Sequence, residues 1–200
     1  MSFCLFLTLA EPLAESRLSL LPAQTRVHTP VKASDPYLDD GAPPPMVLQL
    51  YFDRLAALEE EVVRIGEIVP RCDAQAMAAR AYALPQGGRG RCTYLVAYEG
   101  PAVDEHAWHA HYLAHHPPIM ARLPGLRELE ICARVDWVCR APWRRVDFMQ
   151  RNKVAFDSPE ALTAALGSPV RAEMRADYAK LPAFSGRVTH YAMSTRVLLS

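Results

Sequence analysis

The chain has 200 residues, 50% of them hydrophobic, and its 22 basic residues balance 22 acidic ones, so the formal net charge is zero. This hydrophobic fraction is enough for a packed core, and the length suits one large domain or two small ones. The charge balance argues against a nucleic-acid surface, which carries a basic excess. No apolar run approaches the roughly 18 residues of a membrane span.

The five cysteines are odd in number and show no Cys-x-x-Cys spacing. Reduced thiols in a cytoplasmic protein are therefore expected. The apolar segment at residues 2–10 is short and has no Lys or Arg before it. This favours a buried first strand over a signal peptide.

The pattern of residues 1–85 predicts a degenerate copy of a strand–helix–strand–strand–helix–strand unit. Apolar runs between turn residues predict its strands at residues 2–9, 25–31, 46–53 and 76–84. Residues 54–68 have the periodicity of an amphipathic helix. The first helix of the unit is nearly absent, since only residues 10–20 fill its place. A polar, glycine-rich linker follows at residues 86–91.

Residues 92–200 show the same order more clearly. Apolar runs predict strands at residues 93–99, 126–135, 146–156 and 187–197. Asp104 is expected to cap a helix over residues 104–115, which Pro117 and Pro118 then end.

Ser158 is expected to cap a helix with Pro159 in its first turn, Gly167 to break that helix, and Ser168-Pro169 to cap a second helical stretch to about Ala179. These stretches complete a β-α-β-β-α-β order, which is that of the ferredoxin-like motif. Such a sheet buries one face under its two helices, and its other apolar face needs a partner. We therefore expect an α+β protein. Its two ferredoxin-like repeats pack sheet to sheet as a pseudo-dimeric α+β barrel, with the helices outside.

The most distinctive segment of the chain reads YLAHHPPIM from Tyr112 to Met120, and Leu-Pro-Gly follows at residues 123–125. It resembles the signature of the EthD family, whose members are dimeric α+β barrel proteins. His116 falls on the family histidine and Tyr112 on the second tyrosine of the signature, whereas His111 replaces the first tyrosine. The run FDSPEAL at residues 156–162 also resembles the family's third strand and second helix.

The EthD resemblance implies a role with small molecules, because family members are associated with degradation operons and with small aromatic or ether substrates. Relatives on this scaffold include small monooxygenases, decarboxylases, isomerases and haem proteins. We expect a small, partly aromatic ligand in a barrel cavity, with cofactor-free proton transfer or oxygenation in a catabolic pathway. The alternatives are a non-catalytic binding or accessory protein of a degradation operon, and haem binding by a histidine of this helix. Pairing of two chains into a homodimer is left open.

Two residues of the motif, His116 and Tyr112, are the candidate catalytic pair. Histidine titrates near neutrality and suits general acid–base catalysis, and a tyrosine one turn earlier can donate a hydrogen bond. The alternative for His116 is structural: a protonated ring stabilises the C-terminal end of a helix.

Four further residues are candidate ligand contacts: His109, Trp143, Phe148 and His190. His109 shares a helix face with the catalytic pair. His190 lies on a strand expected to line the barrel, where it could face the same cavity as His116 or be a core histidine. Trp143 and Phe148 flank a basic loop. Aromatic and arginine side chains there can bind an anionic or aromatic ligand, or form a lid or a dimer contact.

His111 and His115 have the i, i+4 spacing of two metal ligands on one helix. No Glu lies between them as in the HExxH motif, and the sequence places no third ligand. Surface exposure of both rings is therefore favoured, and no metal site is predicted.

Overall fold

The computed structural model describes residues 2–199. The first half of the chain contains β1 (Ser2–Leu9), α1 (Glu15–Leu18), β2 (Arg26–Pro30), β3 (Met46–Phe52), α2 (Leu55–Ile68) and β4 (Asp73–Ala81). The second half contains β5 (Cys92–Tyr98), α3 (Glu105–Met120), β6 (Glu128–Arg134), β7 (Arg144–Arg145), β8 (Gln150–Phe156), α4 (Pro159–Leu166), α5 (Pro169–Tyr178) and β9 (Val188–Val197).

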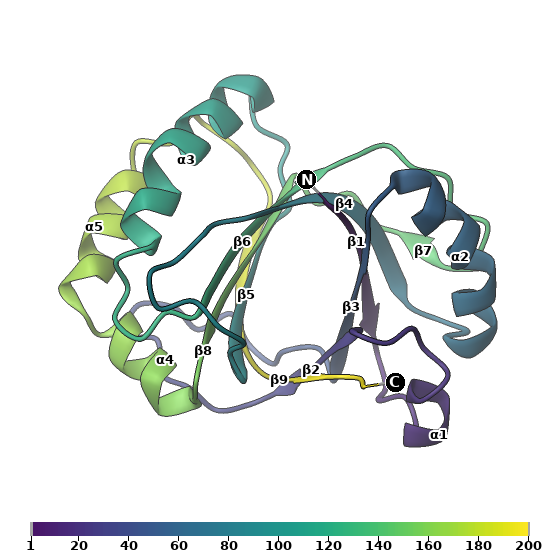
Figure 1. The fold of residues 1–200 in the computed structure, drawn as a ribbon. Coiled ribbons are helices and arrows are strands. Elements are labelled where there is room, and N and C mark those ends of the chain that lie inside the picture. The colour runs from purple at the N-terminus through teal and green to yellow at the C-terminus, as the bar shows by residue number, and fades with distance from the viewer. Residues whose placement is uncertain (1, 200) are drawn as a thin grey trace.

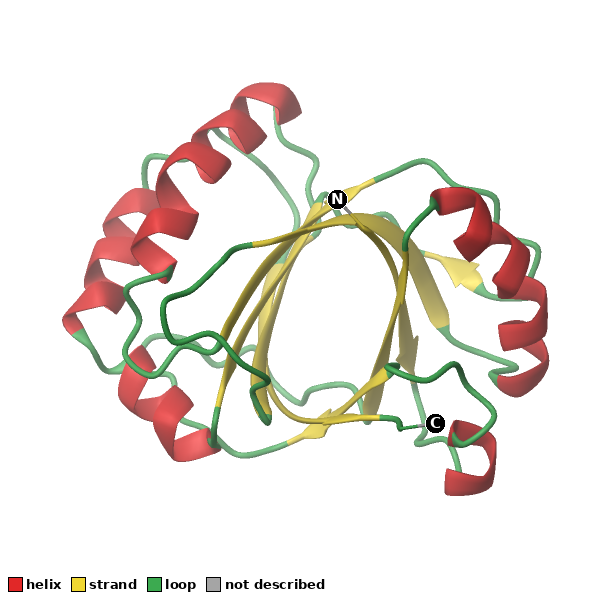
Figure 2. Cartoon of the chain, in the orientation of Figure 1, coloured by secondary structure: helices red, strands yellow, loops and turns green. Residues whose placement is uncertain are grey.

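Over residues 2–199, eight strands close into an antiparallel barrel with the helices packed on its outside (Figure 1, Figure 2). The order around the barrel is β1-β3-β2-β9-β5-β8-β6-β4, and β4 pairs with β1 to close it. The short strand β7 lies parallel to the start of β4. The expected α+β barrel is confirmed.

Each half of the barrel has the strand order of a ferredoxin-like motif. In the first half the order is β4-β1-β3-β2, and in the second it is β9-β5-β8-β6. The two sheets join where β2 pairs with β9 and where β4 pairs with β6. Helix α2 covers the first sheet, and α3, α4 and α5 cover the second (Figure 1).

The barrel strands bury side chains on both faces. In β1, Cys4 and Phe6 belong to the cluster inside the barrel, whereas Leu5 and Leu7 pack outward in the cluster under α2. Successive side chains of a strand point to opposite faces. A strand that is covered on both sides therefore has a continuous apolar sequence. For this reason β1 matches its expected range, residues 2–9, at both ends.

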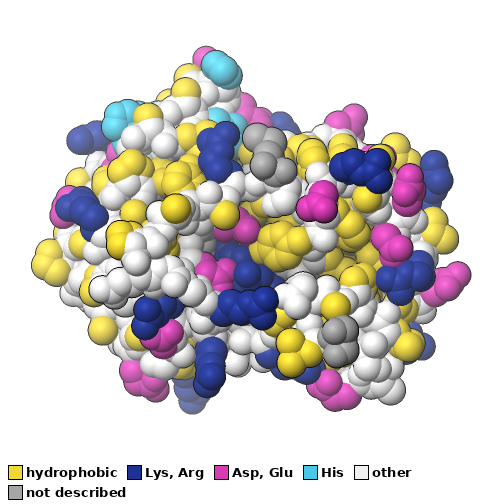
Figure 3. Space-filling view, viewed as in Figure 1, with side chains coloured by type: hydrophobic (Ala, Val, Ile, Leu, Met, Phe, Trp, Pro, Cys, Tyr) yellow, Lys and Arg dark blue, Asp and Glu magenta, His cyan; other side chains and the backbone are white. Residues whose placement is uncertain are grey.

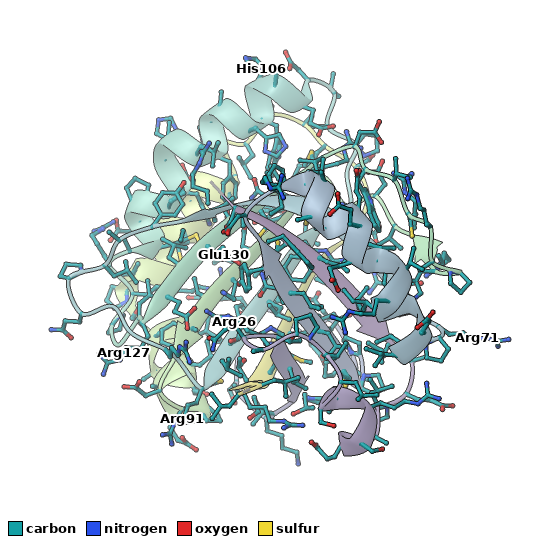
Figure 4. All side chains as sticks on the ribbon, turned by 45° about the vertical axis from the view of Figure 1, so that its right-hand side comes forward. Arg26, Arg71, Arg91, His106, Arg127 and Glu130 are labelled. Atoms are coloured by element: carbon teal, nitrogen blue, oxygen red, sulfur yellow. The ribbon has the colours of Figure 1, made fainter. Side chains whose placement is uncertain are left out.

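Side chains fill the barrel lumen, as expected for eight strands. Lys153 donates a hydrogen bond to the Tyr51 hydroxyl at 2.6 Å and lies 3.4 Å from carboxylate oxygens of both Glu128 and Glu130. Arg26 pairs with Glu128 at 2.7 Å. Arg26 and Glu130 lie on strands that flank one opening of the barrel (Figure 4), where basic and acidic side chains gather in a hollow (Figure 3).

Three expectations of local structure are wrong. The strand expected to begin at residue 146 is β8, which begins at Gln150. Pro117 and Pro118 do not end α3, which continues to Met120. Proline removes a backbone donor from a helix interior, but Pro117 and Met120 are buried, and this burial offsets the lost hydrogen bonds. Strand β4 was expected from residue 76 but begins at Asp73, because its pairing with β1 already starts opposite Thr8.

No helix within residues 2–199 is both long and apolar enough to cross a membrane.

Candidate functional site

A cavity of about 340 Å³ lies between the outer face of the second-half sheet and the helices α3 and α5. Its wall combines apolar and aromatic side chains with a small number of polar groups, which is the usual composition of a small-molecule site. The polar and tyrosine side chains that line it are Tyr94, Tyr98, Tyr112, His116, Asn152, Arg171, Arg175, Tyr178 and His190.

His116 is held on this wall by a carboxylate from α5. Its Nδ1 lies 2.8 Å from Oδ2 of Asp177, and the two side chains are only 5% and 7% exposed. An ionised carboxylate only accepts hydrogen bonds, so Nδ1–H donates and a neutral ring carries its lone pair on Nε2. Burial lowers the pKa of His116 from its ordinary value of 6.5, and Asp177 offsets part of that effect. The partner of His116 is thus a side chain and not the carbonyl end of α3.

Tyr112 lies one turn before His116 and is completely buried. Asn152 Nδ2 donates to its Oη at 2.5 Å, while the Tyr112 O–H points to Sδ of Met120 at 3.7 Å. A thioether is a weak acceptor. Burial raises the pKa of Tyr112 well above 10. The hydroxyl therefore stays protonated.

Arg171 places a buried cation on the same wall. Its Nη2 donates to Oδ2 of Asp35 at 3.0 Å, and Tyr94 Oη donates to the same oxygen at 2.7 Å. Burial acts to raise the pKa of Asp35, but the hydrogen bonds from Tyr94 and the Tyr37 backbone and the charge of Arg171 outweigh it, so the pKa is lowered. The Arg171 Nε–H is buried and has no hydrogen-bond partner within residues 2–199. An unpaired buried donor of this kind is costly.

A second histidine–aspartate pair lies on the cavity wall. Nδ1 and the backbone N–H of His190 both lie 2.8 Å from Oδ2 of Asp40. Burial lowers the pKa of His190, and Asp40 offsets part of that effect. His190 lies on the outer face of β9, so its ring lines the same helix-covered cavity as His116, which was one of the two positions that the sequence left open.

The first half of the chain completes this site. Asp35 and Asp40 both belong to the loop at residues 31–45, between β2 and β3. The same loop is tied to α4 by a hydrogen bond from the Ser34 backbone to Thr163, and Tyr37 packs against the Arg175 guanidinium.

Three of the six predicted site residues, His116, Tyr112 and His190, share the cavity. His109, on the same helix, is not among the side chains that line it. Its Nδ1 lies 3.2 Å from Oε1 of Gln150.

The two predicted aromatic contacts also lie elsewhere. Trp143 is buried against α2, where its Nε1–H donates to the Val69 carbonyl at 2.7 Å. Phe148 lies under the Arg151 guanidinium, 4.3 Å from its carbon to the ring centroid. Neither residue lines the cavity of His116.

The polar partners in this site, Asp35, Asp40, Arg171 and Asp177, carry no distinctive signal in the sequence. Arg171 and Asp177 lie on the buried side of α5 with Met174 between them, and steps of three residues are common on the buried side of any amphipathic helix. Asp40 ends the acidic, proline-rich run DPYLDD, which is also typical of an exposed loop. Their roles follow only from what the fold places opposite them.

A closed barrel of two ferredoxin-like halves with helices on its outside is a dimeric α+β barrel fold, and solved structures share it. An anthrone oxidase-like protein aligns with a TM-score of 0.58 and 11% identity over 98% of this chain and 92% of its own. A candidate monooxygenase from Lactobacillus acidophilus aligns with a TM-score of 0.58 and 11% identity over 99% and 96%. A mutant chlorite dismutase from Candidatus Nitrospira defluvii aligns with a TM-score of 0.53 and 10% identity over 96% and 91%.

Identities this low establish the fold and not the activity. No protein-family model matches the chain, and the search of curated proteins found no match. The cavity is therefore the main guide to the activity.

Proposed function

We propose that this protein is a cofactor-independent enzyme that removes a proton from a small, partly aromatic, weakly acidic molecule, whose anion then reacts with oxygen. The observation that carries the proposal is the buried His116–Asp177 pair on the cavity wall. The EthD-like motif supports the same residue, because His116 matches the family histidine. A role in catabolism is part of the same proposal.

Each polar side chain has a role that follows from its position. His116 Nε2 accepts the proton, and Asp177 orients the ring and stabilises the imidazolium that forms. The positive charge of Arg171, which lines the cavity, stabilises the substrate oxygen on which negative charge develops. The Tyr112 hydroxyl, fixed by Asn152, is a hydrogen-bond donor.

The reaction balances without a cofactor when the substrate has a methylene group activated by an aromatic ketone. Loss of one proton to His116 gives an enolate, which reduces oxygen and combines with it. The peroxide anion takes the proton back, and the hydroperoxide loses water. One methylene group and one dioxygen molecule thus give one carbonyl group and one water. The anthrone oxidase-like and candidate monooxygenase neighbours support this reaction class.

The size of the cavity favours a small substrate over a haem. Its volume of about 340 Å³ lies near the lower end of ligand pockets, which span roughly 300–1,000 Å³. A histidine held by a carboxylate resembles an axial metal ligand. A porphyrin ring, however, needs a wide, flat slot, and buried side chains such as Tyr98, Tyr112 and Phe156 already form this wall. The residues present do not fit the group, and no step is assigned to it.

Turnover of anthrone, followed by oxygen consumption and product absorbance, tests the proposal. We expect His116→Ala to lower kcat by roughly 10²–10⁴-fold, since it removes the base. His106→Ala is the matched control, because His106 is exposed at the far end of the same helix (Figure 4) and is expected to keep wild-type turnover. Wild-type rates in His116→Ala would exclude the base. Binding of anthrone without turnover by the wild-type chain would indicate a binding protein instead.

Asp177→Asn separates orientation from binding. Asn keeps the shape of the side chain but loses the charge that stabilises the imidazolium. We expect kcat to fall by roughly 10²-fold while KM stays close to the wild-type value, because Asp177 acts through His116. A rise in KM with unchanged kcat would show that Asp177 only shapes the cavity.

A further inference from the structure

Two further histidines of α3, His111 and His115, lie near the Asp177 carboxylate oxygen that does not bond His116. One donor atom from each of His111, His115 and Asp177 lies within 4.8 Å of the others. Nε2 of His111 is 3.4 Å from Oδ1 of Asp177, and the two histidine rings have their centroids 4.3 Å apart. We propose that these three side chains bind one divalent transition-metal ion, with Zn²⁺ as the type case.

Both histidines are prepared as ligands. Nδ1 of His115 lies 2.9 Å from the backbone oxygen of His111, so Nδ1–H donates and the lone pair is left on Nε2. A hydrogen bond of this kind to the second ring nitrogen is the usual support of a metal-bound histidine. Nε2 of His111 is buried and has no hydrogen-bond partner among the described residues. It is therefore already stripped of water, and no hydrogen bond competes for it.

The spacing also fits a metal. Bonds of roughly 2.0–2.2 Å in a tetrahedral site place neighbouring ligand atoms about 3.3 Å apart, close to the 3.4 Å between His111 and Asp177. His115 is exposed, so no packed neighbour prevents the small shift that would close the remaining distance while its Nδ1–H stays bonded to the His111 carbonyl. Two imidazole nitrogens and one carboxylate oxygen suit Zn²⁺ and its analogue Co²⁺. Water fills the open position.

The sequence alone placed no third ligand beside this pair. The fold supplies it from α5, and the ion would then link α3 to α5, the two helices that wall the cavity. Asp177 would be shared, with Oδ1 on the metal and Oδ2 on His116. His115 is exposed, so the ion would reach the site from solvent; histidine side chains are visible on this part of the surface in Figure 3.

Titration of the metal-free, untagged protein with ZnCl₂ tests the site, by calorimetry and by competition with a chromophoric chelator. We expect one Zn²⁺ per chain, and an affinity at least tenfold weaker in His115→Ala. His106→Ala, on the same helix and outside the cluster, is the matched control and is expected to bind as wild type does. Co²⁺ in place of Zn²⁺ is expected to give visible absorption bands that His115→Ala loses.

Thermal unfolding provides a second readout, because an ion that binds only the folded state raises Tm. Zn²⁺ is expected to raise Tm of the wild type and of His106→Ala, and not of His115→Ala. Absence of saturable binding, or equal affinity in wild type and His115→Ala, would overturn the site. Metal occupancy and Tm do not depend on turnover, so failure of the metal site and failure of the proposed reaction are distinguishable.

Discussion

In each half of the barrel, the loop between the second and third strands crosses to the other half. The space between sheet and helices is filled by side chains in the first half and holds a cavity in the second, and the two loops contribute to this difference. The loop at residues 31–45 leaves the first half and brings Asp35 and Asp40 to the cavity of the second. The corresponding loop at residues 135–149 leaves the second half and brings Trp137 and Trp143 to the first. One loop thus delivers carboxylates and the other indole rings.

The difference begins with the first helix of each half. In the first half it is α1, with four residues, and in the second it is α3, with sixteen. The space left over the first sheet is filled by α2 and the two tryptophans, which form one hydrophobic cluster. The loop at residues 135–149 packs directly on α2, since a Cβ added to Gly66 would lie 2.8 Å from the Cβ of Ala141. Function on this scaffold thus depends on what fills the space between sheet and helix.

The largest expected effect concerns the filled half. We expect Trp143→Ala to lower the free energy of unfolding by roughly 3–5 kcal/mol, because it opens a cavity under α2 and leaves the Val69 carbonyl without its donor. Denaturant unfolding gives the value. Val138→Ala in the same loop is the control: Val138 is 53% exposed, and we expect a change within about 0.5 kcal/mol. Similar losses in both variants would contradict a packing role for this loop.

A smaller effect is expected in the hollow half. Asp35→Asn removes the charge opposite Arg171, and their side chains are 6% and 10% exposed. Loss of a charged, buried hydrogen bond costs about 1.5–3 kcal/mol, which denaturant unfolding again measures. Asp39→Asn is the control, since Asp39 is exposed in the same loop. If both variants unfold alike, the loop is not anchored through Arg171.

The third prediction concerns the lumen between the halves, where His28 is 0% exposed. Its Nδ1 lies 2.9 Å from Thr195 Oγ1, and it has no carboxylate partner among the described residues. Burial, with Lys153 and Arg26 nearby, lowers the pKa of His28 to about 3. Between about pH 6.5 and pH 3 the unfolded chain therefore binds a proton that the folded chain does not. Stability falls with falling pH by up to about 1.4 kcal/mol per pH unit from this group.

Unfolding free energies measured across this pH window check the third prediction. His28→Gln is expected to flatten the slope, because the titrating group is gone, while His106→Ala is expected to keep it. An unchanged slope in His28→Gln would show that His28 already takes up its proton in the folded chain.

Much of the fold was accessible from the sequence because its elements are local. The apolar run of β1 and the Ser158-Pro159 start of α4 were recognised close to their observed bounds. The continuation of α3 through Pro117 was not, since a proline normally ends a helix. Only burial against the rest of the second half explains why the helix continues.

The site divides in the same way. His116 and Tyr112 were found because they lie one turn apart on one helix, so their proximity is a property of the sequence. Asp177 and Asp40 were missed, because each acts on a histidine 61 and 150 residues away in the chain. Trp143 was assigned to ligand binding because an aromatic ring beside arginines has the same pattern in a core as in a site.

The sequence by itself determined the strand and helix order, the closed pairing of two ferredoxin-like halves and the helix that carries His116, because these follow from periodicity and from apolar faces that must be covered. The tertiary structure decided which half is hollow, on which side of β9 His190 lies, and which carboxylate meets each histidine. Those outcomes depend on barrel closure and on two loops that cross between the halves. They are contacts between residues far apart in the chain, so local sequence patterns do not determine them.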